Sequence, residues 1–131
     1  MGIVKTFLPG VCIAIALAPV IPTDKARAED LSGIFADCAG RYAAEREHAW
    51  LMAVEGAEAA ERRVRRFADL LGATAPAEVR AALLDRRIRA KLAHAQLLQQ
   101  ADLSPDPAAA RWARLRAERQ RGACEGLLLD S

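Results

Sequence analysis

The chain has 131 residues and a formal net charge of +2, and its length predicts a single domain. When an N-terminal leader over residues 1–28 is set aside, 16 basic and 16 acidic residues remain, so the rest of the chain is neutral. This balance excludes the strongly basic composition typical of nucleic-acid-binding domains, and we expect no nucleic-acid partner. Fifteen of the 16 remaining basic residues are arginines, which we attribute, like the abundant alanine, to genome base composition.

Residues 1–28 have the features of a secretory signal peptide. Lys5 precedes an apolar run over residues 7–21, and Ala26-Arg27-Ala28 supplies the small-x-small pattern that signal peptidase requires. We therefore expect cleavage after Ala28, a helical bundle domain over residues 29–131, and a periplasmic or secreted location.

Two other interpretations of the leader are weaker. An uncleaved anchor would need roughly 20 apolar residues to cross a membrane, whereas this run is shorter and contains the helix-breaking Pro9 and Pro19. A lipoprotein would need a small-residue motif before Cys12, and Pro9-Gly10-Val11 does not provide one. We expect no transmembrane segment in the mature chain.

The mature chain is predicted to be all-α, as a small three- to four-helix bundle, because strong helix formers dominate and alternating β-branched residues are almost absent. The first helix is expected to begin near Asp30 or Leu31, with Cys38 and Tyr42 on its apolar face. Gly40 interrupts this pattern at a cost of about 1 kcal/mol relative to alanine. A close approach of another backbone beside Cys38 would explain it.

The second helix is predicted to follow a break at Gly56, to cover residues 57–71 and to close at Gly72. One long rod continuous with the first helix is the alternative. The third helix is expected from the cap Thr74 to about Ala101. Because it is apolar on two opposite sides, we expect it to be the central element. One side consists of Val79, Leu83, Ala90 and Leu97, and the other of Leu84, Ile88, Leu92 and Ala95.

The breaker Ser104-Pro105-Asp106-Pro107 predicts a turn and the start of a fourth helix that ends at about residues 122–125. Trp112 and Leu115 are expected to make its main hydrophobic contacts. The apolar tail over residues 127–129 is expected to fold back on the bundle. The fourth helix also carries a second strip, made of small residues, which consists of Ala110, Ala113, Ala117 and Cys124.

Two cysteines remain after removal of the leader, Cys38 and Cys124. An even number of cysteines in an oxidising compartment favours a disulfide, and nothing matches the C-x-x-C spacing of redox enzymes. We expect a structural disulfide between the first and last helices, with free or intermolecular thiols as the alternative. In the chain-entropy model so long a loop contributes roughly 4–5 kcal/mol, a large share of the stability of an alanine-rich core.

The two histidines, His48 and His94, are weak candidates for a metal site. Glu45 lies three residues before His48 and forms half of a Glu-x-x-His pattern, but Lys91 stands at the matching position before His94. Non-covalent haem with His48 or Met52 as axial ligand has no further support. We therefore expect no cofactor.

Two arginine runs resemble contacts for phosphate or anionic lipid. Val64 interrupts the first run and Ile88 the second, at positions expected to point inward, which is typical of helices with one solvated face. For these runs, contact with an acidic partner or an anionic lipid surface is the alternative. Acidic residues gather over residues 29–61 and basic ones beyond, so we expect oppositely charged helices to face each other, with separate binding patches for two partners as the alternative. The runs are Arg62, Arg63, Arg65 and Arg66, and Arg86, Arg87 and Arg89.

No catalytic signature is present. There is no G-x-S-x-G elbow, and no serine of the mature chain lies near a histidine in sequence. We predict that the protein is not an enzyme. Trp50 and Leu51, by contrast, lie off the main apolar stripe, and large apolar groups that cluster outside a core mark partner surfaces. The alternative is that they pack beneath the second helix or the C-terminal tail.

Three segments resemble a group of small secreted helical proteins from alphaproteobacteria. They are Phe35-Ala36-Asp37-Cys38-Ala39-Gly40-Arg41-Tyr42, His48-Ala49-Trp50-Leu51-Met52 and the closing Cys124. The resemblance covers most of the mature chain. It implies export and the cysteine pair but no activity, because that group is functionally uncharacterised.

These observations together predict an exported, non-enzymatic helical binding or accessory protein of unknown partner. The alternative is a periplasmic carrier of metal or haem, built in the bundle core around His48, Met52 and His94.

Overall fold

The computed structural model describes residues 2, 19, 21 and 23–129, and this part of the chain contains no strand. The predicted all-α bundle is confirmed. Most of the predicted leader lies outside the described residues, and no helix in the described part is both long and apolar enough to cross a membrane. The elements are α1 (Asp24–Met52), α2 (Ala57–Thr74), the 3₁₀ turn η1 (Ala77–Val79), α3 (Arg80–Leu103) and α4 (Pro107–Leu129).

Helix α1 begins earlier than expected because Thr23 caps it, its hydroxyl accepting a hydrogen bond from the Ala26 amide. The expected cleavage site after Ala28 therefore falls inside α1. The helix ends at Met52, and the next residue, Ala53, has a left-handed backbone (φ 52°), as does Gly56 (φ 111°). The predicted break between the first two helices is confirmed.

The end of α2 differs from the prediction. Gly72 lies inside the helix instead of closing it, and Thr74 is its last residue. The Thr74 hydroxyl donates to the Leu70 carbonyl at 2.8 Å, one turn back, so it extends α2 rather than capping the next helix.

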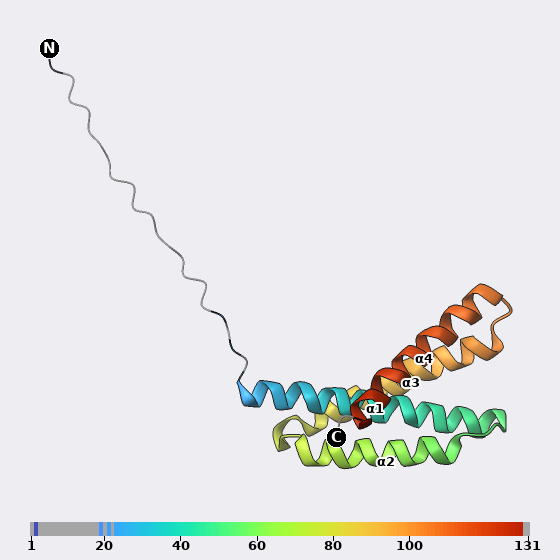
Figure 1. Ribbon diagram of the computed structural model, residues 1–131, viewed down its shortest axis with the longest axis horizontal. Coiled ribbons are helices and arrows are strands. Elements are labelled where there is room, and N and C mark those ends of the chain that lie inside the picture. Colours follow the sequence, from blue (N-terminus) through green and yellow to red (C-terminus); the bar gives the residue numbers. More distant parts are fainter. Residues whose placement is uncertain (1, 3–18, 20, 22, 130–131) are drawn as a thin grey trace.

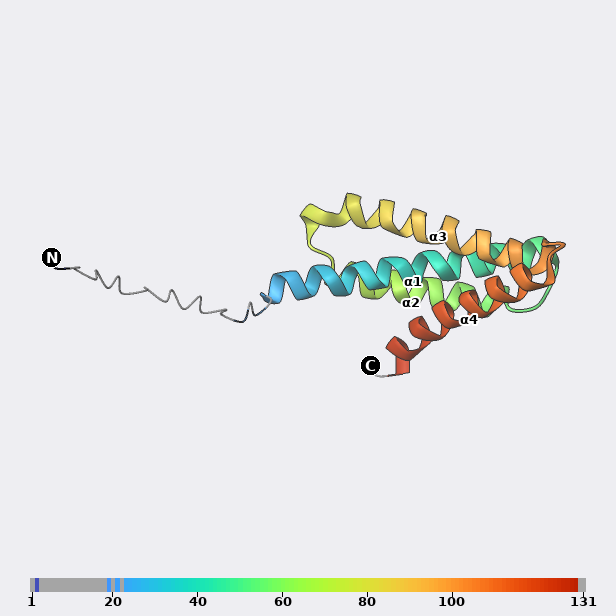
Figure 2. The same cartoon turned by 90° about the horizontal axis from the view of Figure 1, so that it is seen from above.

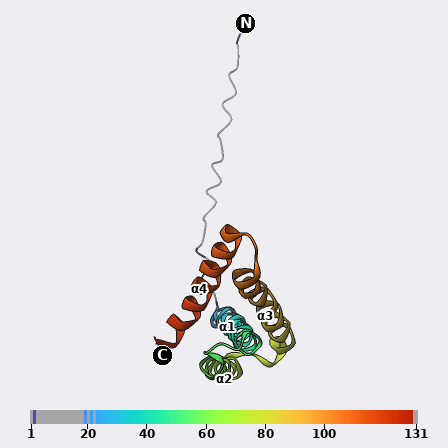
Figure 3. The same ribbon diagram turned by 90° about the vertical axis from the view of Figure 1, so that its right-hand side faces the viewer.

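The central element is α1 and not α3, which corrects the prediction. In the end-on view α2, α3 and α4 surround α1 (Figure 3), and α1 makes extensive contacts with both α2 and α3. Helices α3 and α4 form a hairpin that projects from the α1–α2 pair (Figure 1) and reach α1 on different sides (Figure 2). Only one of the two apolar sides of α3 packs against α1. The second side is exposed at Leu84, Ile88 and Leu92.

The contact between α1 and α3 is close because of Gly40. A methyl group at this position would overlap the Arg87 carbonyl oxygen and lie 2.9 Å from the Lys91 amide nitrogen, both on the α3 backbone. The predicted backbone approach at Gly40 is therefore confirmed. Its partner is α3, however, and not the disulfide-linked helix α4.

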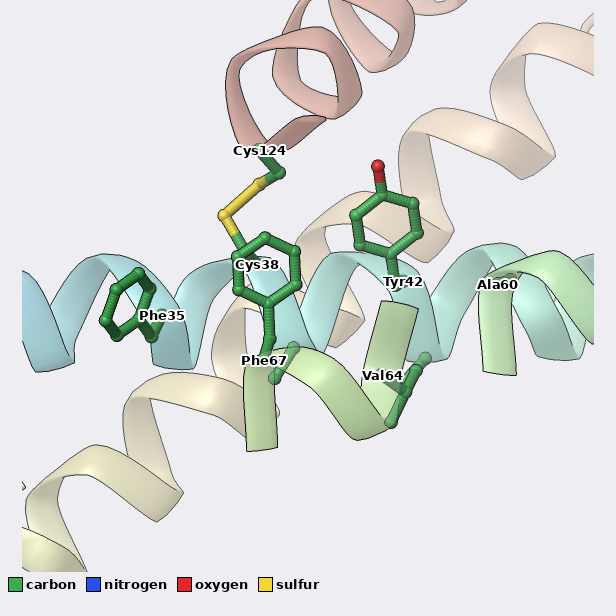
Figure 4. Packing of buried hydrophobic residues seen from close by; sticks show 9 residues of the cluster. Phe35, Cys38, Tyr42, Ala60, Val64, Phe67 and Cys124 are labelled. Carbon is green, nitrogen blue, oxygen red and sulfur yellow. A yellow bond between two sulfur atoms is a disulfide. The ribbon is translucent and has the colours of Figure 1, made fainter. Parts of the chain in front are cut away.

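The largest buried cluster lies between α1, α2 and the end of α4 (Figure 4). Phe67 of α2 is fully buried, and its ring centroid lies 6.1 Å from that of Phe35 and 5.9 Å from that of Tyr42. Helix α4 runs to Leu129, so its predicted end near residues 122–125 is wrong, and the apolar residues expected in a folded-back tail form its last turn. Leu127 and Leu128 pack against the cluster as expected, whereas Leu129 is exposed.

Helix α4 buries its small residues instead of its large ones. Trp112 and Leu115 are more than half exposed, so the prediction that they make the main hydrophobic contacts is wrong. Ala113, Ala117 and Cys124 form the buried face. Small side chains allow the helices of the hairpin to pack closely, and the bulky residues remain on the outside.

Candidate functional site

The disulfide between Cys38 and Cys124 is present, with a Cα–Cα distance of 5.6 Å, inside the usual range for such bonds. It joins the middle of α1 to the last turns of α4, and both cysteines are buried. The Arg41 guanidinium donates to the Cys124 sulfur at 3.6 Å. Because the bond holds α4 against α1, it also positions the neighbouring residues Tyr42 and Glu125.

His94 is a buried polar residue at the junction of three helices. It is 1% exposed, and its ring nitrogens contact side chains from both neighbouring helices. Nε2 lies 2.8 Å from Glu45 Oε1 of α1, and Nδ1 lies 3.0 Å from Gln120 Oε1 of α4. Both nitrogens are thus engaged, as expected for a satisfied core histidine.

His48 has separate partners. Its Nε2 lies 2.7 Å from Asp102 Oδ2 at the end of α3, and Arg114 of α4 lies 3.6 Å from the other oxygen of Asp102. Met52 is exposed. Over residues 23–129, no three histidine, cysteine, aspartate or glutamate side chains come together as a metal-binding group. The structure thus does not unite His48 and His94 in one ligand set.

Ion pairs between α1 and α3 follow the predicted charge asymmetry. Asp37 accepts two hydrogen bonds from Arg86, at 2.9 and 2.7 Å, and this contact raises the pKa of Arg86. Lys91 lies 2.6 Å from Glu47. Oppositely charged residues of the two helices therefore face each other at Asp37 and at Glu47, as predicted from the distribution of charge along the chain.

The two arginine runs differ in whether the apolar residue inside each run is buried. The first run has the predicted pattern, because Val64 is buried while Arg62, Arg63, Arg65 and Arg66 are exposed. In the second run the prediction for Ile88 is wrong, since its side chain is 48% exposed. It belongs to the side of α3 that faces away from α1.

An exposed apolar patch lies where α1 ends. Trp50 is 61% exposed and Leu51 72% exposed, and Met52 and Val54 are exposed beside them. Trp50 and Leu51 therefore do not pack beneath α2 or the C-terminal tail, which was the alternative. The Arg46 guanidinium lies 5.0 Å from the centre of the Trp50 ring. We call Trp50, Leu51, Met52 and Val54 the Trp50 surface.

Arg46 also connects the Trp50 surface to α2. It forms an ion pair with Glu61, and the hydrogen bond from Arg46 holds the pKa of Glu61 below its ordinary value. A second contact joins Arg46 to Glu47 at 3.6 Å. The cation beside the Trp50 ring is therefore held from two sides.

A pocket of about 320 Å³ lies between α1, the α1–α2 turn, α2 and α4. Tyr42, whose side chain is buried, lines it together with charged residues of both signs, and Figure 4 shows the Tyr42 hydroxyl pointing away from Phe67 and Val64. We call it the Tyr42 pocket. Sequence analysis placed Tyr42 on the core face and missed the pocket. The available signal was a phenol hydroxyl on a core stripe, which normally requires a partner. Its lining is Tyr42, Glu45, His48, Ala49, Val54, Glu55, Gly56, Ala59, Ala60, Arg63, Arg121 and Glu125.

Within the described residues, the protein is a bundle of four α-helices in which a disulfide joins the first helix to the last. It carries an exposed aromatic surface and a pocket lined by charged residues. Comparison with protein-family models, with curated proteins and with solved structures finds no match to this chain.

Proposed function

We propose that the protein is an exported, non-enzymatic binding or accessory protein that holds a protein partner through the Trp50 surface. One observation carries the proposal. Four apolar side chains, including a tryptophan, are exposed together within five residues at the end of α1. Large apolar groups that cluster outside a core mark interaction sites.

The composition of the surface is suited to binding. Tryptophan and arginine are enriched among the residues that contribute most to binding energy at protein interfaces, and here Arg46 lies directly over the Trp50 ring. Because Arg46 is also paired with Glu61 of α2, the indole and the guanidinium are arranged before a partner arrives. Such preorganisation lowers the entropy cost of association.

Export is part of the proposal. Its support is the predicted signal peptide together with the Cys38–Cys124 disulfide, since such bonds form and persist mainly in oxidising compartments.

The test compares two tryptophans that differ mainly in position. Trp112 on α4 is exposed to a similar degree as Trp50 and has an arginine, Arg116, 5.5 Å from its ring centre. We expect wild type and Trp112→Ala to capture the same partner from a periplasmic extract, and Trp50→Ala/Leu51→Ala to lose it, with binding weakened at least about tenfold.

Circular dichroism and thermal melting should show that all three proteins are folded alike. Recovery of the same partner by wild type and by Trp50→Ala/Leu51→Ala would assign the function to another surface. The exposed side of α3 supplies the variant for that case, Leu84→Ala/Leu92→Ala, and loss of the partner in this variant alone would contradict the proposal.

A further inference from the structure

We propose that the Tyr42 pocket binds a small zwitterion, a molecule with one carboxylate and one ammonium group and the size of an amino acid or a dipeptide. This inference goes beyond the proposed function, because its ligand is a small molecule. Its site is a different part of the molecule, and only Val54 belongs to both the pocket and the Trp50 surface.

The first observation is a buried hydroxyl without a hydrogen bond. Tyr42 is 3% exposed, and within the described residues its hydroxyl has no hydrogen-bond partner. The Glu125 carboxylate raises the pKa of Tyr42 through its charge and through a side-chain hydrogen-bond contact, but this contact lacks the geometry of a full hydrogen bond. Buried polar groups in folded proteins are almost always paired, so an unpaired one requires an explanation. A ligand group that accepts a hydrogen bond from the hydroxyl provides it.

The second observation is the arrangement of charge around the pocket. Arg63 of α2 and Arg121 of α4 line it together with Glu55 and Glu125. Within the described residues none of these four forms an ion pair, either with each other or elsewhere. Charges of both signs thus share one pocket unpaired, which complements a ligand that also carries both signs.

The hydroxyl and the two arginines define where the carboxylate lies. Tyr42, Arg63 and Arg121 line the same pocket from α1, α2 and α4, and both arginines act electrostatically on the Tyr42 hydroxyl. A carboxylate there accepts a hydrogen bond from Tyr42 and pairs with the guanidinium groups, whose planar fork suits it. The ammonium group faces the glutamates of the same lining.

The remaining lining sets the size and polarity of the ligand. Ala49, Val54, Ala59 and Ala60 contribute apolar walls, and a volume of about 320 Å³ lies at the small end of the range for ligand pockets. Because the Tyr42 oxygen is closed to solvent, a ligand reaches it only when the side chains that cover it move aside.

The experiment is a titration of the purified full-length mature protein, followed by amide resonances in NMR spectra. The probes are the common L-amino acids and alanyl-alanine, each up to about 10 mM, which covers dissociation constants near 1 mM. Each zwitterion that binds is then compared with its carboxylic acid lacking the ammonium group, with its amine lacking the carboxylate, and with inorganic phosphate.

We expect saturable shifts at Tyr42, Ala49 and Arg121 for at least one zwitterion, with the single-charge analogues at least about tenfold weaker because each loses a charged pair. Absence of a saturable shift with every zwitterionic probe would overturn the proposal. Equal affinity for the carboxylic acid or for phosphate would overturn it as well, and would indicate a simple anion site.

Variants test the residues. Tyr42→Phe keeps the ring against Phe67 and removes only the hydroxyl, so binding should weaken about 3- to 10-fold, the range for one hydrogen bond. Arg121→Gln should weaken it about tenfold or more. Arg119→Gln is the control, because Arg119 is exposed and lies outside the pocket lining. Unchanged affinity in both Tyr42→Phe and Arg121→Gln would contradict the assignment, and unchanged melting temperatures would show that the variants fold.

Discussion

At the scale of single residues, Tyr42 links the core to the pocket. Its ring stacks on Phe67 with centroids 5.9 Å apart, while its hydroxyl meets charges from α2 and α4. Burial, and then the Glu125 carboxylate, raise the pKa of Tyr42 to about 12. Its phenol therefore stays protonated, and remains a donor, throughout the ordinary pH range.

The raised pKa of Tyr42 makes alkaline stability a test. The unfolded pKa is near 10, so between about pH 10 and pH 12 the folded state holds this proton more firmly than the unfolded state. The stabilisation is complete below about pH 10 and is lost as pH rises towards 12. Urea unfolding should show this decline in wild type and a shallower one in Tyr42→Phe.

The chain contains one tyrosine, so the ultraviolet absorbance of phenolate reports on Tyr42 alone. A titration of the folded protein with a midpoint near 10 would contradict the burial described here.

At the scale of the elements, the contact between α1 and α3 depends on the missing side chain of Gly40. The α3 backbone lies where a methyl group would project. The contact therefore constrains the spacing of two helices that also exchange ion pairs at Asp37 and Glu47. A single small residue thus sets the distance at which these charges meet.

We expect Gly40→Ala to destabilise the protein by about 1–3 kcal/mol, because overlap with the α3 backbone outweighs the better helix propensity of alanine. The matched control is Gly122→Ala. Gly122 lies inside α4 with nothing near its Cβ position, so alanine should be neutral or stabilise by up to about 1 kcal/mol. Urea unfolding midpoints measure both changes. A neutral Gly40→Ala would mean that α1 and α3 lie further apart.

At the scale of the whole molecule, the disulfide ties the last helix, α4, to the central helix, α1. Helix α4 packs mainly on α3 and has few contacts with α1, and Cys38–Cys124 is a covalent link between α1 and α4. The same bond closes the side of the Tyr42 pocket that α4 provides, since Arg121 and Glu125 flank Cys124 in sequence.

Loss of this bond should cost roughly 2–5 kcal/mol, the usual range for removal of a native disulfide. Cys38→Ser/Cys124→Ser should therefore unfold at lower urea concentration than wild type. A reducing agent should lower the wild-type midpoint towards that of the variant and leave the variant unchanged. A wild-type midpoint that does not respond to complete reduction would show that packing alone holds α4.

Local chemistry accounts for much of what could be predicted. The four helices, the break at Gly56, the turn before Pro107 and the cysteine pair follow from residue propensities and spacing. The Trp50 surface could also be anticipated, because Trp50 and Leu51 fall off the apolar stripe of their own helix. The Tyr42 pocket could not, since its lining comes from α1, α2 and α4, which meet only in the folded protein.

The sequence by itself determined the helices and which residues share a face, because helical periodicity is local. Only the tertiary structure decided which face of each helix is buried. Periodicity shows two apolar sides on α3, and on α4 one strip of bulky residues and one strip of small residues. It does not show which of these sides is buried. The close approach at Gly40 selects the side of α3 that carries Leu83 and His94. In the same way the disulfide at Cys124 helps to select the small strip of α4, so the bulky residues remain exposed.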